Sequence, residues 1–189
     1  TSPLDTSGRY AVAVVTNPAT SQLQNVYDLV NAVNVVGTVA HASSVVACTL
    51  LVSGFDEYKM PMSEAFTITA GTTSKAFTGK KAFRYIRSIA ITGAASLAAN
   101  TLTATVGDVF GFPVKVAAAA DVMLVKMDGA FDTTATIVAA DTTDPATTTT
   151  GDVRGTIDFG ANPNGTASYS ALISCDPSTQ VSAYGVTQA

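Results

Sequence analysis

The sequence predicts an all-β fold, an antiparallel sandwich or barrel with little helix, of which a jelly-roll is one form. Thr and Val account for 28 and 22 of the 189 residues, and their branched Cβ atoms favour extended chain. Short apolar or alternating runs recur roughly every 10–20 residues between Gly, Pro, Asp and Asn, as in sandwiches and barrels. Charged residues make up only 13%, which excludes a coiled coil, and the apolar content of 47% argues against general disorder.

The first quarter of the chain is expected to combine short strands with one helix. Residues 10–15 read as a strand that ends at Asn17 and Pro18. Apolar residues within 21–32 fall at helical spacing, so a short helix is expected there. Residues 33–39 and 45–52 are the next strands; the second is apolar on both faces, which is typical of a covered central strand.

The middle of the chain alternates more regularly. Residues 64–70 and 82–92 are predicted strands because apolar and polar side chains alternate along them. Residues 71–79 between them are expected to be a loop. A strand at 102–106 is followed by a Gly- and Pro-containing segment, 107–113, which is expected to be a compact turn.

The last third is expected to form hairpins. Strands are expected at residues 122–127, 135–140, 153–159, 167–175 and 180–186. Asp128-Gly129 is predicted to join the first two, because this dipeptide suits a tight hairpin turn. Asn162–Gly165 is predicted in the same way to join the strands at 153–159 and 167–175.

The chain is expected to be a single β-rich domain, 1–189, preceded by a flexible arm at about 1–10. The arm is polar and contains Pro and Gly, which suits a segment that becomes ordered on binding. A composition shift near Pro113 leaves a boundary between two subdomains as the alternative. We find no apolar run of membrane-spanning length and no secretory signal, so no membrane partner is expected.

Charge is concentrated in one basic segment of an otherwise acidic chain. The net charge is −4, so nucleic acid is not an expected partner. Five of the ten basic residues lie within thirteen positions, interleaved with aromatic residues: Lys75, Lys80, Lys81, Arg84 and Arg87. They are candidate docking residues for an acidic protein surface; the alternative is a solvated loop that leads into a strand. Arg84 and Arg87 are three residues apart, so strand alternation predicts opposite faces for them.

Candidate catalytic residues are few, and no cofactor or metal site is expected. His41 precedes Ser43 and Ser44 and could act as a general base, but no nucleophile motif frames either serine. The aspartates at positions 121, 128, 132, 141, 144 and 152 could include a glycosidase pair. The interpretation we favour is that they form turns, bonding the backbone two residues on. Cys48 is expected to be buried and inert, and a bridge to Cys175 stays open.

Four segments together resemble virion structural proteins of tailed bacteriophages, of the head decoration (cement) or minor capsid type. They are Gly54–Glu64, Thr78–Ile86, Val106–Val114 and Ala146–Thr156. The resemblance spans about residues 45–160 and carries no catalytic signature. It implies a non-enzymatic, β-rich protein that is made in the host cytoplasm and binds the outside of the capsid. The implied partner is the major capsid protein, and the implied state is a homo-oligomer, with a trimer favoured.

Three functions therefore stand as hypotheses. The first is a cement protein that bridges capsid subunits and stabilises the shell through the added interface, with the basic segment and residues 1–10 as docking contacts. Deleting 1–10 is then expected to abolish capsid binding without unfolding the domain. The second is a tail or head-fibre component that contacts the host surface. The third, less favoured because Trp and nucleophile motifs are missing, is a carboxylate-based hydrolase.

Overall fold

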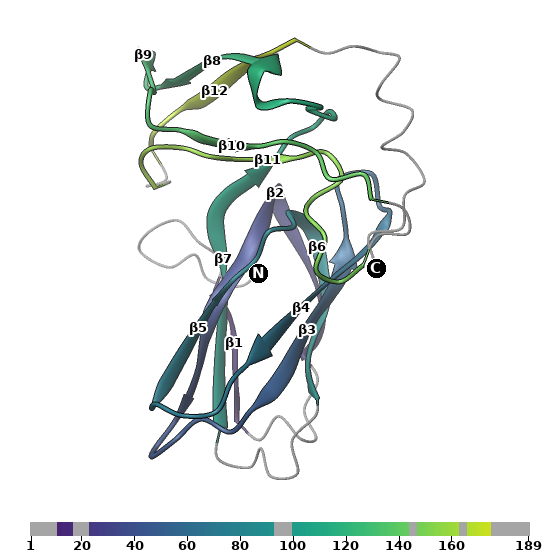
Figure 1. Cartoon of the computed structure of the whole chain (residues 1–189), viewed down its shortest axis with the longest axis vertical. Coiled ribbons are helices and arrows are strands. Elements are labelled where there is room, and N and C mark those ends of the chain that lie inside the picture. Colours follow the sequence, from purple (N-terminus) through teal and green to yellow (C-terminus); the bar gives the residue numbers. More distant parts are fainter. Residues whose placement is uncertain (1–10, 17–22, 93–99, 144–146, 163–165, 175–189) are drawn as a thin grey trace.

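The computed structural model describes residues 11–16, 23–92, 100–143, 147–162 and 166–174 (Figure 1). The expected arm at 1–10, the strand at 180–186 and Cys175 lie outside these ranges. The described strands are β1 (Ala11–Thr16), β2 (Leu23–His41), β3 (Cys48–Phe55), β4 (Pro61–Ile68), β5 (Ser74–Thr78), β6 (Phe83–Thr92), β7 (Asn100–Gly111), β8 (Val122–Met127), β9 (Ala130–Phe131), β10 (Thr136–Val138), β11 (Thr156–Asp158) and β12 (Tyr169–Ile173).

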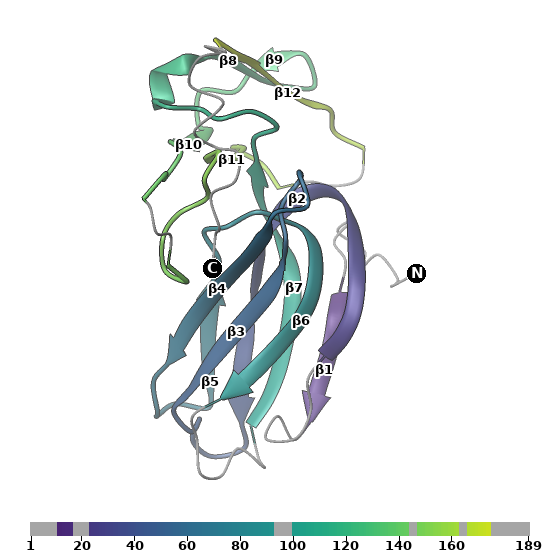
Figure 2. The same cartoon turned by 90° about the vertical axis from the view of Figure 1, so that its right-hand side faces the viewer.

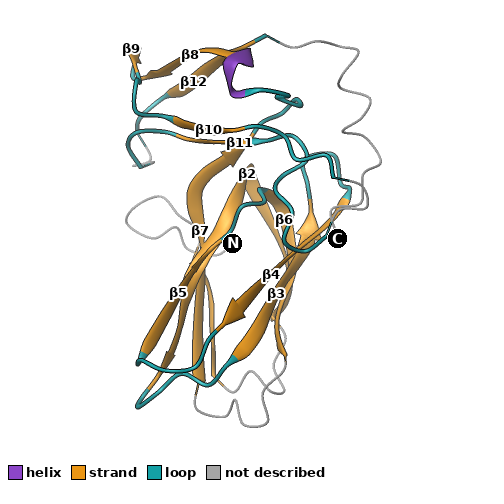
Figure 3. Ribbon diagram, viewed as in Figure 1, coloured by secondary structure: helices purple, strands orange, loops and turns teal. Residues whose placement is uncertain are grey.

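The fold is all-β, as predicted, and every strand pairing is antiparallel. The main sheet has the order β10-β11-β7-β2-β6-β3-β4, with β1 also paired to β7 and β5 to β2. It curls into a half-barrel, seen from two sides in Figures 1 and 2. A second sheet, β12-β8-β9, lies beyond one end of the curl. Within the described ranges the helical content is one 3-10 turn, Ala119–Asp121, and no helix is long and apolar enough to cross a membrane (Figure 3).

The helix expected at 21–32 is wrong, because the described residues of this segment, from Leu23 on, form the first half of β2. Its backbone pairs with β6 from Leu23 to Val33, and β2 then pairs with β7 and β5. The register between β2 and β6 shifts twice, between Gln24 and Tyr27 and again between Asp28 and Val33. These shifts interrupt the strict alternation of a strand, so the apolar spacing resembles a helix although long-range pairing decides the structure.

The loop expected at 71–79 contains a strand. β5 pairs with the end of β2, and Phe77 stands opposite Gly37. A Cβ on Gly37 would lie 2.1 Å from the carbonyl oxygen of Thr103 and 2.7 Å from the Phe77 ring. The glycine therefore gives Phe77 room to enter the core, where its ring centroid lies 4.9 Å from that of Phe66 on β4. This contact brings β5 and β4 together across the open side of the half-barrel.

Two further expectations about turns are also corrected. The segment 107–113 is not a compact turn, because β7 continues to Gly111 and pairs with β11. The Asp128-Gly129 turn is confirmed, with positive φ at both residues, but it joins β8 to the short β9 and not to residues 135–140.

The hairpin expected between residues 153–159 and 167–175 is wrong as well. β11 pairs with β10 and β7 in the main sheet, whereas β12 pairs with β8 in the second sheet. The turn chemistry of Asn162–Gly165 is local information, and it does not reveal that each neighbouring strand has a better partner elsewhere.

The buried apolar side chains form two clusters. The larger fills the curl, and its members include Val35, Val39, Leu50, Val52, Phe83, Ile86, Ile89 and Leu102. The smaller lies beneath the second sheet and is built on Phe112, Val116, Val125 and Ile157. Phe110 on β7 packs against both clusters, so β7 is the strand that connects the half-barrel to the end of the molecule that carries the second sheet.

Candidate functional site

The structure does not gather the five predicted basic residues into one patch. Lys75 lies on β5 opposite Val39, whereas Lys80 lies beyond the other end of the same strand. Lys75 to Thr78 spans about 10 Å of β5 at about 3.3 Å per residue, and Lys80 follows in the turn beyond the strand. Arg84 is only 19% exposed at its side chain, and its Nε lies 3.5 Å from Glu57.

Arg87 is exposed, and its position also corrects the argument from spacing. Ser53 pairs with Ser88 and Gly54 with Ile86, so Arg87 is the extra residue of a bulge in β6. A bulge resets the alternation of side chains along a strand. The separation of three residues therefore does not determine the faces of Arg84 and Arg87.

Lys81 has a structural role, because its side chain is fully buried. Its Nζ donates to the carbonyl oxygens of Ser63 at 2.8 Å and Thr147 at 2.9 Å. Burial lowers the pKa of Lys81, and the nearby carboxylate of Glu64 opposes that effect. A side chain enclosed in this way cannot contact a docking partner, so Lys81 is removed from the predicted docking set.

Glu64 is the buried acidic partner of this turn. It projects inward from β4, and its two carboxylate oxygens accept the backbone N–H groups of Lys80 at 2.6 Å and Lys81 at 3.4 Å. Burial raises the pKa of Glu64 to about 6, although both hydrogen bonds favour the ionised form. The carboxylate thus fastens the turn between β5 and β6 to the inner face of β4.

A second group of buried charged side chains lies at the same end of the half-barrel as the turn between β5 and β6. The Arg154 guanidinium is 1% exposed; Nη1 lies 3.0 Å from Asp56 and Nη2 lies 3.7 Å from Asp152. These contacts are ion pairs without aligned hydrogen bonds from the guanidinium, which also lies over the Tyr58 ring, 5.4 Å from its centroid. The Tyr58 hydroxyl in turn donates to the carbonyl oxygen of Pro113.

The two aspartates also order the backbone around them. Asp56 accepts from the N–H groups of Tyr58 and Met60, and Asp152 accepts from those of Ala82 and Arg154. Burial raises the pKa of Asp152, while Arg154 opposes this shift. Five charged side chains thus form what we call the ionic cluster: Asp56, Glu64, Lys81, Asp152 and Arg154. The contacts described above are with one another, with the Tyr58 ring and with the backbone of this chain, so the cluster connects segments that are distant in the sequence.

His41 takes part in a turn. Its Nδ1 accepts the backbone N–H groups of Ser43 and Ser44, both at 3.0 Å, and lies 3.2 Å from the Ser43 hydroxyl. The serine is therefore near the imidazole, as the general-base hypothesis requires. The Nδ1 lone pair is already engaged by two main-chain donors, and this capping of the turn accounts for the position of the ring.

The turn-forming role of the aspartates is confirmed at Asp132, Asp141 and Asp152. Each accepts the backbone N–H group two residues on, from Thr134, Thr143 and Arg154 respectively. Hydrogen bonds, first that from Gly160 N–H, lower the pKa of Asp132, and those from Thr143 lower the pKa of Asp141. Asp144 lies outside the described residues.

The clearest surface feature is apolar, and the sequence analysis missed it. Four of the five large exposed hydrophobic side chains lie at the end of the molecule with the second sheet: Met123 (68% exposed), Phe131 (70%), Val138 (54%) and Leu172 (56%). We call these four residues the apolar end. Large exposed apolar groups that gather in one place mark interaction surfaces in soluble proteins.

Strand register explains why part of this surface is apolar. Leu172 pairs with Leu124 and Ile173 with Val122, so Met123 is the extra residue of a bulge in β8 and is exposed. Phe131 stands opposite Lys126, whose ammonium lies 5.3 Å from the ring centroid. These positions depend on pairings between β8, β9 and β12, which could not be read from the individual runs.

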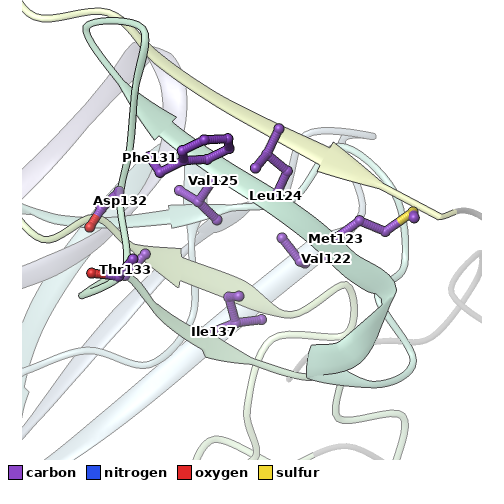
Figure 4. A pocket seen from close by; sticks show the side chains of 9 residues that line it. Val122, Met123, Leu124, Val125, Phe131, Asp132, Thr133 and Ile137 are labelled. Carbon is purple, nitrogen blue, oxygen red and sulfur yellow. The ribbon is translucent and has the colours of Figure 1, made fainter.

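An open hollow of about 300 Å³ lies beside the apolar end. Figure 4 shows Val122 and Val125 of β8 pointing toward Ile137 of β10, with Phe131 and Asp132 at one end of the hollow. Its lining is mainly aliphatic, and the Asp132 carboxylate accepts from Gly160 and Thr134. The hollow therefore suits an apolar side chain of a binding partner.

Comparisons with models of known protein families, with curated proteins and with solved structures find no match.

Proposed function

We propose that this chain is a structural protein of a bacteriophage virion that binds the outside of the capsid and stabilises it by bridging capsid subunits. The observation that carries the proposal is the apolar end, because exposed Met123 and Phe131 beside an aliphatic hollow suit protein docking. The resemblance of residues 45–160 to decoration and minor capsid proteins supplies the class of partner.

The fold supports a load-bearing role for this surface. Phe110 packs against both apolar clusters, and the Tyr58 hydroxyl bonds the Pro113 carbonyl across the same junction. The ionic cluster fastens the residues around this junction on the half-barrel side. A rigid connection between a docking surface and the body of the protein is what a bridge between capsid subunits needs.

Co-sedimentation with empty shells tests the proposal, using shells assembled from the major capsid protein of the phage that encodes this chain. The wild-type protein is expected to sediment with shells, to saturate at a fixed ratio, and to raise the temperature at which the shells disassemble. Absence of binding to the shells would overturn the proposal. Binding to host cells in the same assay format would favour the tail or head-fibre alternative.

Two paired variants identify the surface that docks. Met123→Ser with Phe131→Ser removes exposed apolar groups and is expected to weaken shell binding at least tenfold. Lys80→Ser with Arg87→Ser removes two exposed charges of the predicted basic segment and serves as the matched comparison. If only the second pair weakens binding, the docking surface is the basic segment and the apolar end is not used.

A further inference from the structure

The outer edge of β12 has the features of a strand that pairs with another strand. β12 ends the sheet β12-β8-β9, and β8 is its partner among the described strands. The Asp128 N–H donates to the Ser168 carbonyl oxygen at 2.9 Å, and the Ser168 N–H donates to the Asp128 carboxylate at 2.8 Å, so the backbone groups of Ser168, just before β12, face the β8 side. Alternation in an antiparallel ladder then directs the backbone groups of Ser170 and Leu172 toward β8.

The same alternation directs the N–H and C=O groups of Tyr169, Ala171 and Ile173 away from β8, along the outer edge. The side chains of Ala171 and Ile173 pack against the smaller apolar cluster. Ser170 and Leu172 are exposed on the opposite face. The bulge of this sheet lies in β8, so β12 itself is a regular strand.

β12 lacks the devices that usually prevent edge pairing, whereas the β4 edge has them. β12 contains no charged residue and no proline. β4 begins with Pro61 and contains Glu64, and its Ala65 N–H already donates to the carbonyl oxygen of Thr148. A segment of the chain thus covers the β4 edge, while the β12 edge, as far as the described residues go, presents a row of backbone donors and acceptors.

We propose that two copies of this chain pair through β12, antiparallel across a two-fold axis at Ala171. In this register Tyr169 faces Ile173 of the second copy and Ser170 faces Leu172 of the second copy. Every outward-directed backbone group then meets one from the other copy, and the two small sheets become one continuous sheet. An uncharged strand suits this symmetry, because a charge near the axis would meet the same charge on its mate.

This inference does not depend on the capsid proposal, and it refines the expected oligomer. A two-fold contact through β12 produces a dimer, whereas the sequence analysis favoured a trimer. Two apolar ends are brought together across the axis, so a dimer would present two copies of the hollow. Such a particle has the geometry to contact two capsid subunits at once.

Disulfide trapping between two different variants tests the register. Ser170 and Leu172 direct their backbone groups to β8, so across the axis they form a non-hydrogen-bonded pair with Cα atoms about 4.5 Å apart. That separation is within the range of a disulfide. Ser170→Cys and Leu172→Cys are made in a Cys175→Ser background, mixed, and oxidised. We expect a cross-linked dimer in the mixture and several-fold less in either variant alone.

Solution mass supplies the second measurement, by size-exclusion chromatography with light scattering. Wild type is expected to be a dimer, and the combined change Ser170→Lys with Leu172→Lys is expected to give monomers with an unchanged circular dichroism spectrum. Phe131→Lys, on the opposite edge of the same sheet, is the control and is expected to keep the dimer. A monomer at all concentrations overturns the proposal, as does a dimer or trimer that the mixed cysteines fail to cross-link.

Discussion

The ammonium group of Lys81 lies 2.9 Å from the carbonyl oxygen of Thr147, 66 positions along the chain. The same group donates to the Ser63 carbonyl on β4, so one side chain joins the edge strand to the segment that crosses it. Ala65 of β4 donates its N–H to the Thr148 carbonyl beside this contact. Lys81 therefore holds the segment around Thr147 against the half-barrel, and its buried ammonium group binds backbone carbonyl oxygens of this chain.

Replacing Lys81 is expected to destabilise the fold strongly. Lys81→Met keeps the aliphatic stem but removes the charge, leaving Glu64 without its buried cationic neighbour. The Ser63 and Thr147 carbonyl oxygens also lose their buried donor, and removing a buried charged partner of this kind costs about 3–5 kcal/mol. Chemical denaturation should show this loss in the free energy of unfolding. Lys80→Met, at the exposed neighbouring position, is the control and is expected to change stability by no more than about 0.5 kcal/mol. Equal effects of the two variants would contradict the assignment.

Glu64 gives the stability of the protein an unusual dependence on pH. Burial raises its pKa from 4.5 to about 6, so folding takes up a proton between these values. This contribution to stability is complete below pH 4.5 and is lost as the pH rises through about 6, a change of about 2 kcal/mol. Glu64→Gln removes the titration. Between pH 4.5 and pH 7 the wild type should therefore lose about 2 kcal/mol of unfolding free energy relative to the variant. Parallel curves of unfolding free energy against pH would show that Glu64 does not titrate in this range.

Asp141 should affect stability with the opposite sign. Hydrogen bonds from the Thr143 hydroxyl and the Gly151 N–H lower its pKa below 3.8, so its contribution is present above pH 3.8 and is lost as the pH falls through the lowered value. Asp141→Asn is expected to be less stable than wild type at pH 6, with a difference that shrinks in acid. Thr143→Val removes only the hydroxyl donor and should give an intermediate result in acid-denaturation curves. A difference that is constant with pH would contradict this account.

Part of the fold could be predicted from local pattern, because β3 and β4 each carry one regular face toward the core. Leu50 and Val52 alternate with half-buried neighbours on β3, and the predicted strand at 45–52 overlaps β3, which begins and ends three residues later. β2 and β5 could not be predicted in this way. β2 contains two register shifts, and β5 is short and, apart from Ala76 and Phe77, polar. Their pairing is determined by partners distant in sequence, which a single run of residues does not reveal.

The candidate site was less predictable for the same reason. The basic segment was visible in the sequence, yet Lys81 is buried, and Lys75 lies within β5 whereas Lys80 lies in the turn beyond it. The apolar end was missed because runs such as Val122–Met127 resemble core strands, and only the pairing of β8 with β12 shows which residues face outward. A short exposed strand and a short buried strand can have the same composition.

Gly37 offers a sharp test of how the half-barrel closes. An added Cβ would lie 2.1 Å from the Thr103 carbonyl oxygen and 2.7 Å from the Phe77 ring, and the first of these neighbours is backbone that cannot turn away. Gly37→Ala must therefore push β2 from β7 or expel Phe77 from its contact with Phe66, and we expect a loss of about 3 kcal/mol in unfolding free energy. Thr38→Ala, at the half-buried next position, is the matched control and should cost less than about 1 kcal/mol.

Phe77→Ala removes the ring and should cost about 3–4 kcal/mol by itself. If Phe77 is the main obstacle, Gly37→Ala combined with Phe77→Ala should destabilise less than the sum of the single changes, since neighbouring substitutions that relieve one clash are not additive. Full additivity would instead assign the whole cost of Gly37→Ala to the Thr103 carbonyl and to the spacing of β2 and β7.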